Sequence, residues 1–197
     1  QQKAVNAALS CQWHQGVLIA PCGAGKTEIG MAVIAHLGRP ALWITHTLDL
    51  AQQAKERAQL RLGLDEREVS IISGAHKRCG TKLTIATVQS LYRMELDELA
   101  RTVGVVIVDE CHLVNPKEGM YRDFFKAIHC KIIGLTATPY RLYSTRNGSV
   151  LRFITNTKPR VFSRVLFFVQ IGYLFSQGFL AKLNYYRIPL IDLSRLQ

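Results

Sequence analysis

The sequence predicts an α/β domain in which a mostly parallel sheet is flanked by helices on both faces. Short apolar runs alternate with longer segments of helical pattern along most of the chain. One of these runs, residues 105–108, reads Val-Val-Ile-Val, which is typical of a strand buried on both faces. Each polar motif described below directly follows such a run, and parallel sheets bind ligands at the carboxyl ends of their strands.

The first half of the chain alternates strand and helix with clear boundaries. A short buried strand is expected at 17–20, followed by a glycine-rich turn and a helix from Lys26 to about Leu37. A second strand at 41–45 leads into a polar helical segment from 48 to about 62. The remaining elements are expected as strands at 69–73 and 82–86, two short helices within 88–101, a strand at 105–108, a helix at 121–129 and a strand at 132–135.

Beyond about Leu142 the pattern changes. Residues 143–159 are rich in turn-forming side chains, and 162–175 form an apolar stretch that fits a helix or a strand. Residues 184–191 are the candidate for a last strand.

The composition indicates a packed, basic protein. Of 197 residues, 48% are hydrophobic, which excludes a disordered chain. Lys and Arg number 25 against 14 Asp and Glu, a formal net charge of +11. This surplus favours a polyanionic partner, because basic side chains that neutralise phosphates release counterions; a merely basic soluble protein also fits.

Neither a membrane segment nor a disulfide framework is expected. The longest apolar run, 165–175, is broken by Gln170 and is shorter than the roughly 20 residues that a bilayer needs. The five cysteines are scattered and form no Cys-x-x-Cys pair, so neither a zinc site nor paired disulfides are predicted. Reduced thiols in a cytoplasmic protein are the simpler interpretation.

The clearest motif is Ala-Pro-Cys-Gly-Ala-Gly-Lys-Thr at 20–27, which follows a predicted strand and opens a predicted helix. This is the context of a phosphate-binding loop, in which Lys26 can reach the β- and γ-phosphates and the Thr27 hydroxyl can bind Mg²⁺. An ordinary glycine-rich turn is the alternative. The strict pattern has glycine where Ala20 stands, at a position that need not touch phosphate. The candidate nucleotide-binding residues are Pro21, Cys22, Gly23, Ala24, Gly25, Lys26 and Thr27.

An acidic pair follows the strand at 105–108 in the sequence Asp-Glu-Cys-His. Asp109 suits the role of an outer ligand for a phosphate-bound Mg²⁺, and Glu110 suits a general base that activates the attacking water. Cys111 is interpreted as a packing residue. His112 is either a satisfied polar residue or part of the acidic site.

The third motif, Thr-Ala-Thr-Pro at 136–139, also follows a predicted strand. The hydroxyls of Thr136 and Thr138 could hydrogen-bond the acidic cluster and relay the presence of a γ-phosphate. A simple strand-to-turn cap is the alternative.

Together these segments resemble motifs I, II and III of superfamily 2 helicases and translocases of the DEAD/DEAH-box kind. The letters Asp-Glu-Cys-His fit the DExH branch best. Residues 45–53 resemble motif Ia, and 84–91 resemble the motif Ib–Ic region. The sequence is most similar to bacterial and phage proteins related to restriction-enzyme motor subunits and DNA-repair helicases.

The resemblance implies a RecA-like ATP-binding lobe at 1–142 and a connecting segment at 143–197, with a second lobe expected beyond it. It implies ATP and Mg²⁺ as cofactors, with hydrolysis coupled to movement on, or unwinding of, nucleic acid, DNA rather than RNA. The expected location is the cytoplasm of a bacterial or phage-infected cell. Because the second lobe would supply the arginine fingers, residues 1–197 alone are expected to bind nucleotide and hydrolyse it slowly.

The resemblance also assigns roles to individual residues. Lys26, Asp109 and Glu110 would be catalytic, with Thr27 and Asp109 on the metal, and Gln1 would contact adenine. His112, Thr136 and Thr138 would couple the nucleotide to the rest of the motor. The expected nucleic-acid contacts are Thr45, His46, Thr47, Thr87, Gln89, Ser90 and Arg141.

Two other functions remain open at this point. A P-loop ATPase of another class would share the phosphate-binding loop, but the Thr-Ala-Thr-Pro motif argues against it. A non-catalytic nucleic-acid-binding module would keep the fold, but the intact Lys26, Thr27, Asp109 and Glu110 argue against lost catalysis.

Overall fold

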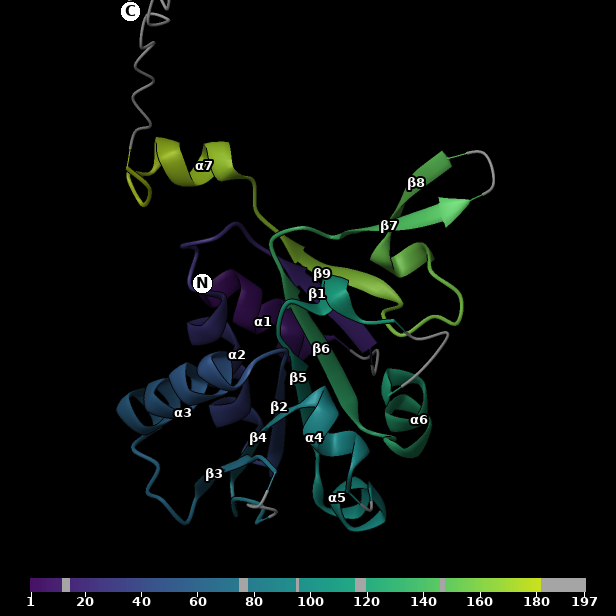
Figure 1. The fold of residues 1–197 in the computed structure, drawn as a ribbon. Helices are drawn as coiled ribbons and strands as arrows, with labels where there is room; N and C mark the ends of the chain where they lie inside the picture. Colours follow the sequence, from purple (N-terminus) through teal and green to yellow (C-terminus); the bar gives the residue numbers. More distant parts are fainter. Residues whose placement is uncertain (12–14, 75–77, 95, 116–119, 146–147, 182–197) are drawn as a thin grey trace, which may run out of the picture.

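The computed structural model describes residues 1–11, 15–74, 78–94, 96–115, 120–145 and 148–181. Its centre is a seven-stranded sheet with the order β3-β4-β2-β5-β6-β1-β9, in which every neighbouring pair is parallel (Figure 1). The predicted parallel α/β fold is therefore confirmed. The strands are β1 (Gln15–Ile19), β2 (Ala41–Thr45), β3 (Val69–Ile72), β4 (Leu83–Thr87), β5 (Val105–Val108), β6 (Lys131–Thr136) and β9 (Arg164–Phe168).

Helices cover both faces of the sheet. The longer ones are α1 (Gln2–Ser10), α2 (Lys26–Leu37), α3 (Leu48–Leu62) and α6 (Met120–Ala127); the shorter ones are α4 (Val88–Tyr92), α5 (Leu96–Thr102) and α7 (Ile171–Ser176). Two separate hydrophobic clusters result, one beneath α1, α2 and α3 and the other beneath α4, α5 and α6. In β5, Val105 and Ile107 enter the first cluster while Val106 and Val108 enter the second, which explains its uninterrupted apolar sequence.

None of the helices in the described ranges combines the length and the apolarity that a membrane crossing requires.

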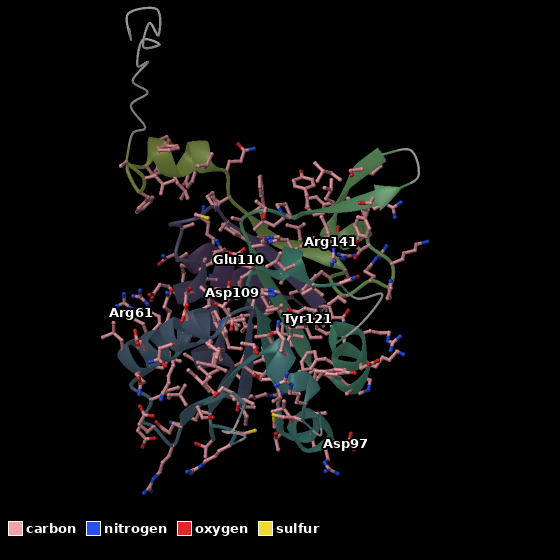
Figure 2. The ribbon with its side chains drawn as sticks, viewed as in Figure 1. Arg61, Asp97, Asp109, Glu110, Tyr121 and Arg141 are labelled. Carbon is pink, nitrogen blue, oxygen red and sulfur yellow. The ribbon has the colours of Figure 1, made fainter. Side chains whose placement is uncertain are left out.

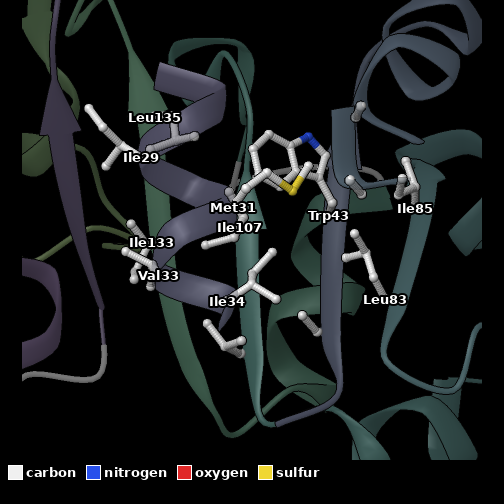
Figure 3. Close-up of a cluster of buried hydrophobic side chains, with 14 of the residues drawn as sticks. Ile29, Met31, Val33, Ile34, Trp43, Leu83, Ile85, Ile107, Ile133 and Leu135 are labelled. Atoms are coloured by element: carbon white, nitrogen blue, oxygen red, sulfur yellow. The ribbon is translucent and has the colours of Figure 1, made fainter. Parts of the chain in front are cut away.

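A glycine brings α2 close to the centre of the sheet. Trp43 of β2 is fully buried against α2, and Figure 3 shows its indole beside Met31. A Cβ atom built on Gly30 would lie 2.6 Å from Trp43 Cζ3 and 3.2 Å from Leu135 Cδ1. The helix can therefore reach this depth only without a side chain at position 30.

Replacing Gly30 by Ala is expected to lower the free energy of unfolding by about 1–3 kcal/mol, because the added methyl group overpacks the Trp43 cluster. Urea denaturation measures the change. Gly172→Ala is the matched control, since nothing lies within 4 Å of the Cβ it would add. Equal stability of the two variants would contradict this account of the α2 contact.

The segment beyond the third motif contains more regular structure than the sequence indicates. A hairpin of β7 (Tyr140–Thr145) and β8 (Gly148–Phe153) projects from the sheet where turns were expected (Figure 1). The apolar stretch at 162–175 holds both a strand and a helix: β9 pairs with β1 at the edge of the main sheet, and α7 follows. The candidate strand at 184–191 lies outside the described residues. The helix α1 was not predicted.

Candidate active site

The three motifs follow three strands that are neighbours in the sheet, in the order β5-β6-β1. Because all strands are parallel, the loops after them leave the same edge. The Ala20 amide donates to the Thr136 carbonyl (3.0 Å), which ties the first motif to the third. On the other side of β5, the Asp109 amide donates to the carbonyl of Ile44 in β2 (2.9 Å). Figure 2 shows where Asp109 and Glu110 lie on this edge.

The predicted phosphate-binding loop, residues 20–27, has a positive φ at both of its glycines and leads into α2. Gly23 and Gly25 adopt left-handed φ angles of 80° and 78°, which cost little only for glycine. Gly25 is the N-cap of α2 and has no side chain that could cap the helix. The backbone amides of the first turn therefore have no side-chain acceptor at the N-cap and are suited to bind an anion. The Gln1 side-chain amide donates to the Ala24 carbonyl (3.3 Å), and a Cβ on Gly25 would collide with it.

Lys26 and the acidic motif meet at this edge. Lys26 Nζ lies 3.9 Å from Glu110 Oε1, and both side chains are partly buried. Glu110 Oε2 lies 3.4 Å from His112 Nδ1. Glu110 has a φ of 44° and is the only non-glycine residue in the described ranges with a left-handed backbone. That conformation is costly for a side chain with a Cβ, and such strain is found mostly at functional sites.

The third motif contacts the second through Thr136. Its buried hydroxyl lies 3.0 Å from His112 Nδ1, donates to the Thr138 carbonyl (3.2 Å) and accepts from the Thr138 amide (3.0 Å). Thr138 thus takes part through its backbone, and its side chain is exposed. A continuous line of contacts runs from Lys26 through Glu110 and His112 to Thr136.

Thr27 and Asp109 line one cavity of about 400 Å³ that also reaches α3. Burial, and secondly the neighbouring charge of Glu110, raise the pKa of Asp109 above its usual value. A divalent cation would relieve both effects, and a hydroxyl with a carboxylate is a suitable oxygen pair for Mg²⁺. Within the described ranges no group of three His, Cys, Asp or Glu side chains could hold a metal.

The same cavity contains residues that sequence reasoning missed. Gln53 and Arg57 of α3 line it beside Thr27. Arg57 Nη1 and Arg61 Nε lie 3.2 Å and 2.8 Å from the Glu28 carboxylate. The spacing of Arg57 and Arg61 by four residues was the available signal, since it puts both on one face of a helix.

The loops after β2 and β4, which are adjacent strands, carry most of the expected nucleic-acid contacts. Thr45 is buried and its hydroxyl donates to the Thr47 carbonyl (3.0 Å), while Thr47 Oγ1 accepts from the Leu50 amide (3.3 Å) to cap α3. Thr87 is also buried, and its hydroxyl caps α4 by accepting from the Ser90 amide (3.2 Å). These hydroxyls therefore stabilise the backbone of their own loops by hydrogen bonds.

The other expected contacts are placed differently. Gln89 is exposed beside the α4 cap. Arg141 donates to the carbonyl of Val114 and lies with its guanidinium 5.8 Å from the centre of the Tyr143 ring. His46 turns toward Tyr121 of α6, a residue that the sequence did not single out.

Comparison with known proteins identifies the family to which this chain is similar. The model of the family described as type III restriction enzyme, res subunit, matches residues 1–141. The chain belongs to this family. Its match includes the three motifs and both loops after β2 and β4, so the superfamily 2 resemblance of the sequence is confirmed.

The relatives of this chain include DNA helicases and translocases. The chain is 34% identical over 147 residues to the DNA 3'-5' helicase XPB of Mycobacterium tuberculosis, covering 71% of this chain and 26% of that protein. It is 32% identical over 143 residues to the DNA 3'-5' translocase XPB2 of Sulfurisphaera tokodaii, covering 72% and 30%. The chain thus spans less than a third of either relative.

A solved structure supports the fold independently. The UvsW helicase from bacteriophage T4 superposes with a TM-score of 0.60 at 18% identity, over 71% of this chain and 52% of that one. At this identity the likeness is one of fold, and it agrees with the predicted RecA-like parallel sheet.

Proposed function

We propose that this chain is the ATP-binding lobe of a nucleic-acid-dependent ATPase that couples hydrolysis to movement on, or unwinding of, DNA. The single observation that carries the proposal is the meeting of Lys26 and Glu110 at 3.9 Å, from two loops that lie far apart in the sequence. A phosphate-binding lysine and a candidate general base are thereby in reach of one substrate.

In the proposed reaction the chain's own residues bind, orient and accept a proton. The amides at the start of α2 and the Lys26 ammonium bind the phosphates, and Lys26 exchanges Glu110 for them. The Glu110 carboxylate, released from that ion pair, orients the attacking water and accepts its proton. Thr27 and Asp109 would hold Mg²⁺, which neutralises the charge that develops on the phosphate oxygens. Gln1 is proposed to contact the adenine.

The line of contacts from Glu110 through His112 to Thr136 supports a coupling role for these side chains, with Thr138 acting through its backbone. For the nucleic acid we propose the loops after β2 and β4. Thr45 and Thr87 would shape these loops, and Thr47, Gln89 and Ser90 would meet the phosphates. Arg141 is proposed to act at the neighbouring β7. The names of the DNA helicase relatives support DNA over RNA.

We further propose that residues 1–142 form the ATP-binding lobe, to whose sheet the later segment adds the edge strand β9, that 143–197 lead toward a second lobe and that the protein is cytoplasmic. A hollow of about 930 Å³ beside the phosphate-binding loop supports a docking face there. It is lined by apolar side chains, including Pro139, Phe168 and Ile171, and the last two are more than half exposed. The free thiols of all five cysteines support a reducing compartment.

Phosphate release from ATP, measured with Mg²⁺ and with no nucleic acid, single-stranded DNA, duplex DNA or RNA, tests the proposal. We expect Mg²⁺-dependent ATP binding and slow hydrolysis by residues 1–197 alone, and a higher rate with DNA in the full-length protein that carries the second lobe. A protein that binds DNA but no ATP would instead be a non-catalytic module, and ATP turnover that ignores nucleic acid would indicate another class of P-loop ATPase.

A further inference from the structure

The hairpin of β7 and β8 carries two arginines directly opposite each other. Arg141 of β7 and Arg152 of β8 are partners in the antiparallel register, so both side chains lie on one face of the hairpin. The next pair, Leu142 and Leu151, lies on the other face and is exposed. Like charges that face each other across two strands are destabilising. The arginine pair is therefore explained better by a ligand than by the stability of the hairpin.

Tyr143 holds the guanidinium groups of the arginine pair. It is two residues beyond Arg141 on β7 and therefore shares the same face. The centre of its ring is 5.8 Å from Arg141 Cζ and 5.3 Å from Arg152 Cζ, and both distances are within the range of a cation–π contact. Arg141 also donates a hydrogen bond to the carbonyl of Val114. The two cations thus lie around one ring, which limits their freedom before a ligand binds.

The arginine pair belongs to a strongly basic part of the chain. Among the residues that the structure describes, neither Arg141 nor Arg152 lies within ion-pair distance of an Asp or Glu. The sequence explains this, because residues 124–191 contain ten Lys and Arg and not one Asp or Glu. This segment therefore carries most of the net charge of +11. A basic surface without acidic residues is the electrostatic pattern of a face that binds nucleic acid.

The arginine pair lies at the same edge of the sheet as the acidic motif. Strand β7 begins directly after the third motif, and Figure 2 shows Arg141 at the foot of the hairpin, on the edge that carries Glu110. The carbonyl that Arg141 contacts, that of Val114, directly follows the turn Cys111–Leu113. The loops after β2 and β4 also leave this edge, because all strands of the sheet are parallel. A nucleic acid bound both to those loops and to the arginine pair would follow one edge of the protein.

We propose that the arginine pair, held by Tyr143, binds the phosphate backbone of one DNA strand. The inference rests on the proposed function and deepens it, since it adds Tyr143 and Arg152, which lie outside the motifs, to the surface that meets nucleic acid. Planar guanidinium groups donate parallel hydrogen bonds to phosphate oxygens. Such contacts position a strand without reading its sequence. A phosphate bound by the pair also offsets the repulsion between Arg141 and Arg152.

Fluorescence anisotropy of a labelled single-stranded oligo-dT, titrated with the full-length protein at several salt concentrations, tests the inference. We expect Arg152→Ala to weaken binding about five- to tenfold at low salt, the effect of one lost charge-assisted contact. The slope of log affinity against log salt is expected to become shallower by about 0.7, the value for one phosphate contact on a single strand. Arg152→Lys keeps the charge without the planar fork and is expected to keep the slope with an intermediate affinity. Tyr143→Leu is expected to weaken binding about two- to fivefold with the slope unchanged, because both charges remain.

Arg67→Ala is the matched control, because it removes the same charge from an exposed arginine just before β3. It is expected to change neither the affinity nor the salt slope. The inference is overturned if Arg152→Ala and Arg67→Ala bind the oligonucleotide alike, and the basic face would then be a site for an acidic protein surface. DNA-stimulated hydrolysis that accompanies such equal binding would leave the proposed function standing. If binding depends on Arg152 but the wild-type protein hydrolyses no ATP, the proposed function fails and the role of the arginine pair stands.

Discussion

Glu110→Gln is expected to lower the rate of ATP hydrolysis by about 10²–10⁴-fold, the usual contribution of a general base. The amide keeps the size of the side chain but cannot accept a proton from water. ATP binding is expected to be equal or tighter, because the variant removes a negative charge 3.9 Å from Lys26 and near the site of the phosphates. Single-turnover hydrolysis and equilibrium nucleotide binding measure the two quantities separately.

The matched control is Glu66→Gln. Glu66 is exposed and pairs with Lys55 at 2.5 Å, away from the three motifs, so its loss is expected to leave hydrolysis unchanged. Hydrolysis by Glu110→Gln at the parental rate would show that another group activates the water. A parallel loss of ATP binding would show that the variant has damaged the site as a whole.

Asp109→Asn is expected to abolish most hydrolysis while stabilising the nucleotide-free protein. Loss of a metal-directed carboxylate removes several kcal/mol of transition-state stabilisation, which corresponds to at least about 10²-fold in rate. Asn keeps an oxygen for the hydrogen bond that Asp109 Oδ1 accepts from the Glu110 amide (3.0 Å). It also removes the charge that burial and Glu110 disfavour.

The pH dependence of stability follows from the raised pKa of Asp109. An acid whose pKa is higher in the folded state than its value of 3.8 in an unstructured chain costs no stability below that value. The cost appears as pH rises from there and is complete once pH exceeds the folded pKa of Asp109. Asp109→Asn should therefore unfold at a higher temperature than wild type at pH 7, and the difference should shrink as pH falls below the folded pKa.

Thermal unfolding with and without Mg²⁺ and ATP measures both parts of this prediction. Wild type is expected to gain more stability from Mg²⁺ with ATP than the variant does. A variant less stable than wild type at pH 7 in the absence of nucleotide would mean that the Asp109 carboxylate is satisfied within the protein. The interpretation of its burial would then be wrong.

The arrangement of the sheet could be predicted because its signals are local and strong. The run at 105–108 has no polar residue, so it must be covered on both faces, and strands of that kind are parallel and alternate with helices. Once the strands are parallel, the three motifs must lie at one edge. The meeting of Lys26 with Glu110 follows from that rule together with the neighbouring positions of β1, β6 and β5.

Other parts had no comparable signal. The helix α1 buries Ala4, Val5 and Ala8, which are small and make only a thin apolar stripe. The strands β7 and β8 are largely exposed on both faces, and apolar residues lie among their exposed positions. Their sequence therefore lacks the clear alternation of apolar and polar residues that predicts a half-buried strand. Turn-forming residues around position 148 indicated the turn but not the strands on either side of it.

Side-chain roles were the least predictable feature. A threonine at a strand end can cap a helix or contact a ligand, and Thr87 does the former by a hydrogen bond to the Ser90 amide. Likewise His46 and Tyr121 are 75 residues apart, and their contact depends on the packing of α6 beside the end of β2. No local pattern encodes such a contact.

The central claim is that one triphosphate and its metal bind where the three motifs meet. A crystal structure with a non-hydrolysable ATP analogue and Mg²⁺ tests it most directly. The account predicts the triphosphate on the amides at the start of α2, with Lys26 Nζ moved from Glu110 to a phosphate and Mg²⁺ between Thr27 and Asp109. A triphosphate bound elsewhere, with Lys26 still paired to Glu110, would contradict it.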